Sequence, residues 1–282
     1  MNYGIEGCLK GRDVVSLIGN STGPLVSVII PTRNRCFLLA RAIESVLKQN
    51  YSDIELVIVD DASEDGTKET VDKYQQRFRN IKYIRNNLRC RGAKSRNIGL
   101  ANVSGKYIAF LDDDDEWLPD KISKQVKVLE ENLNVGAVSC WYNKVYNGRI
   151  QKVKLVPTVT FESMLWDNFL GSFSLCMIRG DMARSVRLDP SLYSAQDWDF
   201  WIELSKVTKI CIIKEYLVNY YDHSEVRISN KPLNHLLVNR RKIYFKYRNY
   251  MSEKCRIYHI LSIRQYRILA SNNFFFKKSA IC

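Results

Sequence analysis

The stretch YIAFLDDDDEW, residues 107–117, decides the fold, because it joins a short apolar segment to four consecutive aspartates. Residues 107–111 are of the kind that forms a buried β-strand. Asp112, Asp113, Asp114 and Asp115 follow where that strand would end. The stretch therefore predicts a strand that brings carboxylates to one edge of a sheet.

Upstream segments extend this prediction to a whole sheet. Residues 25–30 (LVSVII) form a β-branched run closed by Pro31, which is typical of a strand buried on both faces. Two more strands are predicted over residues 54–59 and 81–84. Helical patterns separate the four strands, and they cover residues 37–47, 64–78 and 93–101. Strands that alternate with helices indicate an α/β fold, with a Rossmann-like, mostly parallel central sheet flanked by helices.

Three of the four predicted strands end in polar residues. Ligands of such sheets bind beyond the carboxyl ends of the strands. The sequence therefore predicts a ligand site at this edge, built from three groups of residues: Thr32-Arg33-Asn34, Asp60-Asp61 and Asp112 to Asp115.

Four adjacent carboxylates repel one another unless a cation neutralises them. Hard oxygen ligands favour Mg²⁺ or Mn²⁺, and Mg²⁺ often shares its coordination between one or two carboxylates and substrate phosphates. The alternative is a solvated acidic turn that caps a helix beginning near Pro119. Asp60-Asp61 has a similar alternative as a loop and helix cap, with Asp65-Gly66 as the turn.

The second half of the chain has a less regular pattern. Residues 172–178 and 210–220 predict strands, and residues 194–206 (SAQDWDFWIELSK) predict a helix. Beyond Asn230 the pattern is helical, basic and aromatic, and no internal repeat is found. We expect an arm over residues 1–23, a globular domain over 24–229 and a basic, aromatic-rich helical tail over 230–282.

Composition and charge narrow the class of protein. The 282 residues are 46% apolar and 26% charged, which excludes collagen-like, low-complexity and disordered chains. The net charge of the chain is +13. Residues 230–282 contain twelve basic residues and one acid, so this segment carries +11 and the rest of the chain carries +2. A basic tail suggests an anionic partner.

The cysteine pattern and the lack of targeting segments suggest where the chain works. Eight cysteines occur without a CxxC pair and with three histidines, which argues against structural zinc and favours a reduced, cytosolic chain. Residues 1–20 have no secretory signal pattern, and no apolar run is long enough to span a bilayer. Any contact with a membrane is therefore expected at its surface.

Four motifs, in order, carry a resemblance to a known family: VSVIIPTRN, ELVIVDDASEDGT, GAKSRNIGLANVSGKYIAFLDDDDEWLPDKI and AQDWDFW. Over residues 24–229 the chain resembles the inverting family 2 glycosyltransferases, which have the GT-A fold. The resemblance implies a nucleotide-sugar donor and a divalent cofactor, Mn²⁺ or Mg²⁺.

The resemblance also assigns roles to residues by position. The nucleotide-binding positions of the family match Pro31, Thr32, Arg33, Asp61 and, less directly, Asp60. The DxD motif matches Asp112, expected near the ribose, and Asp114, expected on the metal. Asp113 stands where a small residue is common and is assigned to the nucleotide-sugar site with Asp112. Arg96 matches a position that lines the donor pocket. His223 matches a histidine found near the metal or the diphosphate, with a surface turn as the alternative.

The family's general base is an acid at the start of a late helix. Asp197 stands there, Asp199 is the competitor two residues along, and Gln196 replaces a frequent glutamate. Such a carboxylate takes the proton of the acceptor hydroxyl as that hydroxyl attacks the anomeric carbon. Trp117, which follows the acidic run, fits either the floor of an acceptor pocket or the core.

The basic tail allows three interpretations. Basic and aromatic residues on helices suit an anionic membrane surface, a packed helical lobe, or RNA. The charge favours the membrane, so we expect a cytoplasmic protein, peripheral on the inner face of the cell membrane.

The sequence thus predicts an inverting, metal-dependent glycosyltransferase of the hexosyltransferase type. The donor is expected to be a UDP-sugar and the acceptor a lipid-linked saccharide of surface polysaccharide assembly. One alternative keeps the fold but uses a polyprenyl phosphate or protein acceptor. An alternative of another class is a basic nucleic-acid binding protein with an inactive nucleotide-binding domain.

Overall fold

A computed structural model describes residues 23–156, 158–222 and 233–278, with the backbone alone described for the helical residues 233–236 and 267–278. The described strands form one mixed sheet in the order β3-β2-β1-β4-β8-β6-β9-β5, with β7 paired to β6. Their bounds are β1 Val26–Thr32, β2 Ile54–Asp60, β3 Ile81–Arg85, β4 Tyr107–Phe110, β5 Glu116–Trp117, β6 Val135–Tyr146, β7 Arg149–Val153, β8 Met177–Arg179 and β9 Lys209–Tyr221.

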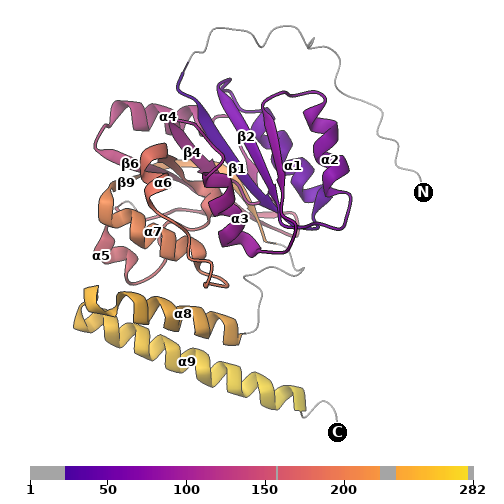
Figure 1. The fold of residues 1–282 in the computed structure, drawn as a ribbon. Helices are drawn as coiled ribbons and strands as arrows, with labels where there is room; N and C mark the ends of the chain where they lie inside the picture. Colours follow the sequence, from indigo (N-terminus) through magenta and orange to yellow (C-terminus); the bar gives the residue numbers. More distant parts are fainter. Residues whose placement is uncertain (1–22, 157, 223–232, 279–282) are drawn as a thin grey trace.

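The first half of the chain forms the predicted parallel sheet. Strand β1 pairs in parallel with β2 and β4, and β2 pairs in parallel with β3. The helices that connect and follow these strands lie against the sheet (Figure 1). They are α1 Cys36–Leu47, α2 Thr67–Gln75, α3 Arg91–Leu100 and α4 Lys121–Glu131. The α/β fold expected from the alternating pattern is confirmed.

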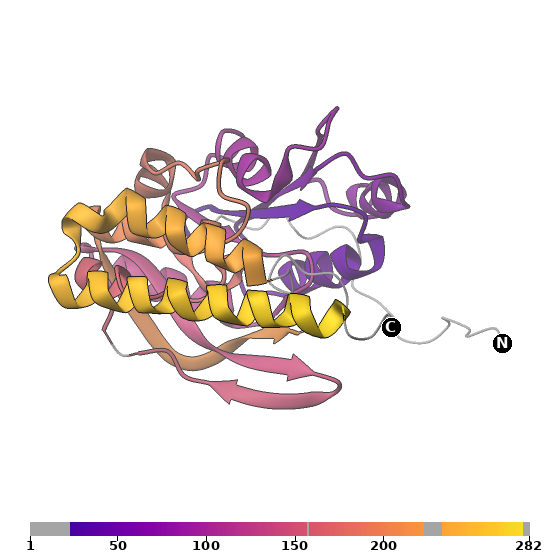
Figure 2. The ribbon, with the colours of Figure 1, turned by 90° about the horizontal axis from the view of Figure 1, so that it is seen from below.

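The second half adds antiparallel pairs and corrects one prediction. Within the segment predicted over residues 172–178, only Met177 and Ile178 lie in a strand, β8 (Met177–Arg179). Phe173–Leu175 instead forms a 3₁₀ helix that Ser172 caps. An unpredicted hairpin joins β6 to β7 through Asn147-Gly148, both with positive φ (46° and 74°), and it projects from the body (Figure 2). Asn-Gly is the strongest short hairpin signal in a sequence.

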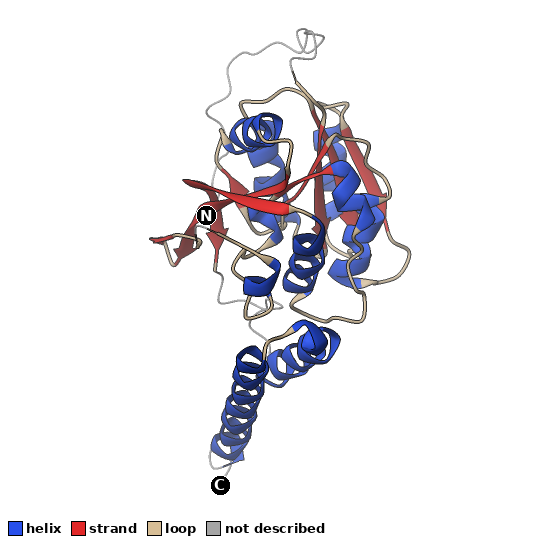
Figure 3. Cartoon of the chain, turned by 90° about the vertical axis from the view of Figure 1, so that its left-hand side faces the viewer, coloured by secondary structure: helices blue, strands red, loops and turns tan. Residues whose placement is uncertain are grey.

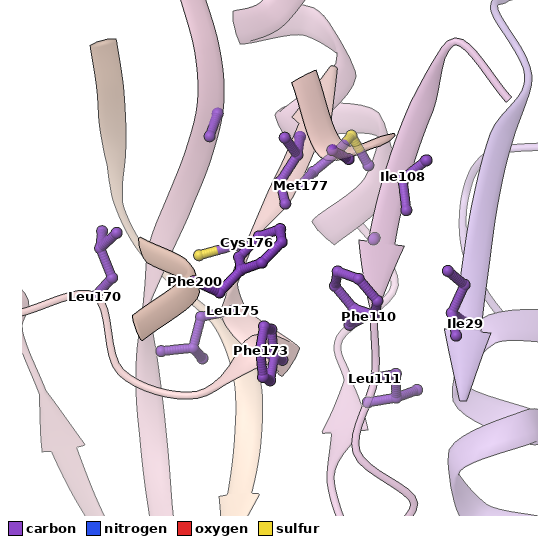
Figure 4. Packing of buried hydrophobic residues seen from close by; sticks show 14 of the residues in the cluster. Ile29, Ile108, Phe110, Leu111, Leu170, Phe173, Leu175, Cys176, Met177 and Phe200 are labelled. Atoms are coloured by element: carbon purple, nitrogen blue, oxygen red, sulfur yellow. The ribbon is translucent and has the colours of Figure 1, made fainter. Parts of the chain in front are cut away.

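Aromatic side chains fill the core where the two halves of the sheet meet (Figure 4). The ring of Phe110, on β4, lies 5.2 Å from that of Phe173 and 6.1 Å from that of Phe200. Phe200 belongs to α7, Gln196–Val207, so the core ties the start of this helix to the end of β4. The remaining short helices are α5 Phe161–Met164 and α6 Gly180–Ser185.

The C-terminal hairpin, residues 233–278, packs on the body. Its helices α8 (Leu233–Tyr247) and α9 (Glu253–Lys278) run antiparallel and side by side, joined by the 3₁₀ helix Arg248–Tyr250 (Figures 1 and 2). Figure 3 shows α9 extending away from the body at its far end. Side chains of the hairpin are nevertheless buried: Asn239, Ile243, Tyr247, Met251, Cys255 and His259.

Polar contacts hold the hairpin in place as well. His259 Nε2 lies 2.7 Å from the carbonyl oxygen of Leu165, and the imidazole stacks on Trp198 with ring centroids 5.9 Å apart. Packing, one of the three interpretations of the basic tail, is therefore observed. Among the described residues, no helix combines the length and the apolar character needed to cross a bilayer.

Candidate active site

A cavity of about 650 Å³ opens at the carboxyl ends of β1, β2 and β4. It brings together nine of the predicted site residues: Pro31, Thr32, Arg33, Asp61, Arg96, Asp112, Asp113, Asp114 and Asp197. Residues 193–198 and the C-terminal hairpin, through Asn239, Arg240 and Tyr266, line it from the other side. The convergence expected at this edge of the sheet is thus present.

The end of β1 is linked to the acidic run across the cavity floor. The Thr32 hydroxyl donates a hydrogen bond of 2.8 Å to Asp113 Oδ2. Arg33 Nη1 turns back and donates to the carbonyl oxygens of Asp61 and Ala62, at 2.5 and 3.0 Å. Arg33 therefore fixes the loop after β2.

Arg35, which the sequence did not single out, forms ion pairs with two carboxylates of the acidic run. Its Nη1 donates to Asp113 Oδ1 at 2.8 Å and to Asp114 Oδ2 at 3.1 Å. Burial raises the pKa of Asp113 to about 6, and repulsion from Asp114 acts in the same direction against the attraction of Arg35. These two carboxylates therefore converge on a single cationic group.

Asp112 points to a different partner. Arg96 Nη2 donates to Asp112 Oδ1, and the Arg96 guanidinium lies 4.5 Å from the centroid of the Phe173 ring. The fourth aspartate, Asp115, is fully buried and accepts a hydrogen bond of 2.6 Å from Ser174. The run thus divides into two carboxylates on Arg35, one on Arg96 and one inside the core.

Asp61 organises the loop that leads into α3. Its carboxylate accepts hydrogen bonds from the backbone N–H groups of Cys90 at 2.6 Å and Arg91 at 2.8 Å. Burial acts to raise the pKa of Asp61, but these hydrogen bonds outweigh it and lower the pKa. Asp61 is therefore ionised at neutral pH, and it lines the cavity.

Asp60 does not line the cavity, although the sequence grouped it with the nucleotide-binding residues. Its side chain is 1% exposed, and its oxygens accept hydrogen bonds from the Ser63 backbone N–H at 2.8 Å and the Tyr83 hydroxyl at 2.5 Å. The carboxylate of Asp60 therefore stabilises the loop after β2, which is the alternative that the sequence left open for Asp60-Asp61.

Asp197 lies half-buried at the start of α7 and lines the same cavity as the acidic run. Asn168 Nδ2 donates to its Oδ2 at 3.1 Å, and the Trp198 backbone N–H donates to its Oδ1 at 2.8 Å. Burial raises the pKa of Asp197 to about 6 despite the hydrogen bond from Trp198, and the charge of Asp112 adds to the rise. A carboxylate with such a pKa can accept a proton near neutral pH.

Asp199, the competing base candidate, faces away from the cavity. It is fully buried and binds two residues of α8: Lys246 Nζ lies 2.7 Å from Oδ1, and the Tyr247 hydroxyl donates to the same oxygen at 2.7 Å. Trp117 is also outside the cavity, because it is 2% exposed and donates from Nε1 to the Ser174 carbonyl oxygen at 2.8 Å.

A metal site is only partly defined by the chain itself. Among the described residues, no group of three or more histidine, cysteine, aspartate or glutamate side chains could hold a metal ion. His223, predicted as a ligand, lies outside the described residues. Asp113 and Asp114 form a pair of hard oxygen ligands, which fits a divalent ion that takes its other ligands from water and substrate phosphates.

Left-handed backbone conformations surround the cavity. Asn34, Ala62, Arg91 and Ala195 have φ between 51° and 71° although none of them is glycine. Each of them lines the cavity or directly adjoins a residue that does, at the ends of β1 and β2 and at the starts of α3 and α7. Such strained residues persist where the surrounding structure holds them, and they cluster at functional sites.

Comparison with protein-family models shows which family the chain belongs to. The model of Glycosyl transferase family 2 matches residues 27–179, more than half of the chain. The fold and the cavity define a GT-A glycosyltransferase. The chain belongs to glycosyltransferase family 2.

Curated relatives extend the similarity beyond the matched segment. An uncharacterised glycosyltransferase of Methanocaldococcus jannaschii is 30% identical over 238 residues, which cover 82% of this chain and 80% of that protein. A relative from Escherichia coli, named UDP-Glc:alpha-D-GlcNAc-diphosphoundecaprenol beta-1,3-glucosyltransferase, is 29% identical over 75% of this chain and 82% of its own length.

Solved structures show the fold. S. aureus TarS in complex with UDP-GlcNAc superposes with a TM-score of 0.67 at 21% identity, over 78% of this chain and 66% of the TarS chain. A mannosyltransferase from Pyrobaculum calidifontis in complex with GDP-Man and Mn²⁺ superposes with a TM-score of 0.60 at 20% identity, over 79% of this chain and 64% of that one.

Proposed function

We propose that this glycosyltransferase moves a sugar, with inversion, from a UDP-sugar to a hydroxyl of a lipid-linked saccharide in surface polysaccharide assembly. The observation that carries the proposal is that Asp197 lines the same cavity as Asp112 and Asp114. A base and a diphosphate-binding edge in one cavity suit a single in-line displacement at the anomeric carbon.

The donor half is proposed from the residues at the strand ends. Pro31, Thr32, Arg33 and Asp61 hold the nucleotide, and Asp112 with Arg96 lies toward the ribose and the sugar. Asp60 supports the donor half by fixing the loop after β2, since Tyr83 and Ser63 donate hydrogen bonds to its carboxylate.

A divalent ion, Mn²⁺ or Mg²⁺, is proposed as cofactor, held by Asp114 with support from Asp113 and His223. When bound, it would neutralise the charge of the departing nucleoside diphosphate, so that no protein acid is needed. Arg35 occupies the same two carboxylates in the structure and is the group that a bound ion would displace.

The acceptor half is proposed around Asp197. Asn168 and the backbone N–H of Trp198 orient the carboxylate, so that one oxygen can take the proton of the attacking hydroxyl. Asp199 is not needed for this step, because Lys246 and Tyr247 hold it inside the body.

The C-terminal hairpin is proposed to meet an anionic membrane surface on the cytoplasmic side. Outward-facing basic residues lie beside exposed apolar ones, of which Phe245 is 54%, Ile257 49% and Leu261 57% exposed. The exposed basic residues with described side chains, apart from Lys246, which pairs with Asp199, are Arg241, Lys242, Arg248, Lys254, Arg256 and Arg264. Such a surface suits the headgroup region of a bilayer. We propose residues 24–229 as the catalytic part, 230–282 as this extension and 1–23 as an arm.

Two measurements test the proposed function. A thermal-shift screen of nucleotide sugars with Mn²⁺ identifies the donor, because a bound ligand raises the melting temperature. Calorimetry of the Asp114→Ala variant with that donor is expected to show loss of Mn²⁺-dependent binding. Metal-dependent binding that persists unchanged in the variant would remove Asp114 from the metal site.

A further inference from the structure

Ser174 is a fully buried residue behind the acidic run, and its hydroxyl makes two hydrogen bonds. Its oxygen accepts from the backbone N–H of Asp112 at 3.0 Å, and its proton is donated to Asp115 Oδ2 at 2.6 Å. A serine hydroxyl has one proton to donate, so these two partners fix its orientation. Ser174 thus holds the first and the last residue of the acidic run.

The acidic run is itself a turn that presents two carboxylates. The backbone N–H of Asp115 donates to the carbonyl oxygen of Asp112 at 3.0 Å, and this hydrogen bond closes what we call the acidic turn, residues 112–115. Its two middle residues are Asp113 and Asp114, the carboxylates proposed to hold the divalent ion. Because Ser174 ties both ends of the acidic turn to one oxygen atom, it fixes where the middle pair lies.

Ser174 is held in place by its own neighbours. It is the middle residue of the 3₁₀ helix Phe173–Leu175. Its backbone N–H donates to Ser172 Oγ at 3.2 Å, and its carbonyl oxygen accepts from Trp117 Nε1 at 2.8 Å. The hydroxyl therefore has a fixed place from which to hold the acidic turn.

The stretch of chain that carries Ser174 also reaches the proposed base. Asn168 Nδ2 donates to Asp197 Oδ2 and to the carbonyl oxygen of Gly171, at 3.1 Å in both cases. Asn168 Oδ1 accepts from the backbone N–H groups of Leu170 at 3.2 Å and Gly171 at 3.1 Å. Both ends of the amide are engaged, which fixes the side chain. We call residues 168–175 the bridging segment, because it contacts the base at one end and the acidic turn at the other.

The bridging segment is anchored in the core between its two ends. Leu170, Phe173 and Leu175 are buried there (Figure 4). Trp201 Nε1 also donates to the carbonyl oxygen of Gly171 at 3.1 Å. Close-packed interiors are hard to compress and transmit strain. A shift at one end of the segment is therefore passed to the other end.

We propose that Ser174 is a positioning residue for sugar transfer, which sets Asp113 and Asp114 in place relative to Asp197 through the bridging segment. The inference rests on the proposed function, because it concerns the ion and the base of that reaction. An in-line displacement needs the departing diphosphate and the attacking hydroxyl in precise register, so a small shift of either slows it. Residues behind metal ligands typically contribute about 10- to 100-fold to metal affinity or activity.

Calorimetry of UDP binding to the full chain, with Mn²⁺ as the varied component, tests the effect on the ion. Ser174→Ala removes both hydrogen bonds to the acidic turn, so the Mn²⁺ concentration for half-maximal binding is expected to rise about ten-fold or more. The matched control is Ser45→Ala, which removes a buried hydroxyl of α1 that donates to the Ala42 carbonyl oxygen at 2.8 Å. This control is expected to bind UDP like the wild type.

Amide hydrogen exchange in the metal-free protein tests the bridging segment without the ion. In Ser174→Ala, exchange is expected to quicken in the acidic turn and also at Leu170 and Gly171, whose N–H groups bond to Asn168. Unchanged exchange at Leu170 and Gly171 would confine Ser174 to the acidic turn and overturn its link to the base. The control variant should leave exchange in both places as it is in the wild type.

A folded Ser174→Ala protein with the Mn²⁺ dependence of the wild type would overturn the positioning role, even with a lower melting temperature, because the residue would then only stabilise the fold. Should Ser174→Ala not fold, Ser174→Cys carries the test, since a thiol is a weak donor and a weak acceptor. It is expected to raise the Mn²⁺ requirement too, and no rise would again overturn the role. The proposed function fails on a different result, the absence of Mn²⁺-dependent UDP binding in the wild type, which would remove this inference with it.

Discussion

Lys246 donates hydrogen bonds to both carboxylate oxygens of Asp199, at 2.7 and 2.9 Å, across the junction between α8 and α7. This pairing commits Asp199 to holding the C-terminal hairpin. Asp197, two residues earlier, remains free of any ion pair among the described residues and lines the cavity. The side of α7 that each acid faces is the observation that favours Asp197 as the proposed base.

Asp197→Asn is expected to lower the rate of sugar transfer by about 10²- to 10⁴-fold while donor affinity stays unchanged, because only the proton acceptor is lost. Transfer rate and calorimetric donor binding are the two measurements. Asp199→Asn is the matched variant, and we expect it to lower the melting temperature through the weakened Lys246 contact. Normal turnover of Asp197→Asn would place the base elsewhere.

The pH profile of transfer should reflect the pKa of Asp197, about 6. The base must be ionised, so kcat/KM is expected to rise with pH through 6 and then level off, and to fall about ten-fold per unit below it. Asp113 has a pKa in the same range, and donor binding measured over the same pH interval separates the two. A transfer profile that simply follows donor binding would assign the transition to Asp113.

Arg35→Gln should make stability depend on the divalent ion. Removing the guanidinium leaves Asp113 and Asp114 facing each other, so the free energy of unfolding is expected to fall by about 1–3 kcal/mol without metal. Mn²⁺ should then raise the melting temperature more than in the wild type. Arg41→Gln is the control, since Arg41 donates to the backbone carbonyl of Asp114 instead. Equal Mn²⁺ shifts in all three proteins would contradict the shared site.

Replacing Lys254, Arg256 and Arg264 by glutamine should weaken sedimentation with phosphatidylglycerol vesicles by about 100-fold, at about 1 kcal/mol for each basic residue at the surface. The control changes the same charge elsewhere, in Lys68, Lys127 and Arg149, which are all exposed. If both triple variants sediment alike, the hairpin is not the membrane contact. Point variants serve better here than a truncation, because Ile243, Tyr247 and His259 are buried against the body.

Much of the fold of the first half of the chain could be predicted from local sequence patterns. Buried parallel strands are short apolar runs, and the polar residues that follow them meet at one edge of the sheet. Arg35 escaped prediction: its role depends on where the chain after β1 turns, and a left-handed residue, Asn34, makes that turn. Asp197 and Asp199 could not be separated, because residues two apart on a helix face different ways and the first turn sets which one faces the cavity.

The contacts of the C-terminal hairpin could not be predicted from local sequence patterns. Arg240 and Tyr266 line the cavity across more than a hundred residues of sequence from the acidic run, and no periodicity encodes such a meeting. By contrast, the hairpin of β6 and β7 could have been predicted, because Asn147-Gly148 is typical of a two-residue turn between paired strands.

The placement of Arg240 and Tyr266 has a consequence for synthesis of the protein. Chains emerge from the ribosome with the amino end first, and early segments can fold before later ones appear. The parallel strands and the acidic run can assemble while the hairpin is still being translated, but the cavity has no outer wall until residue 266 has emerged. A nascent chain can therefore present a formed sheet edge long before it presents a finished catalyst.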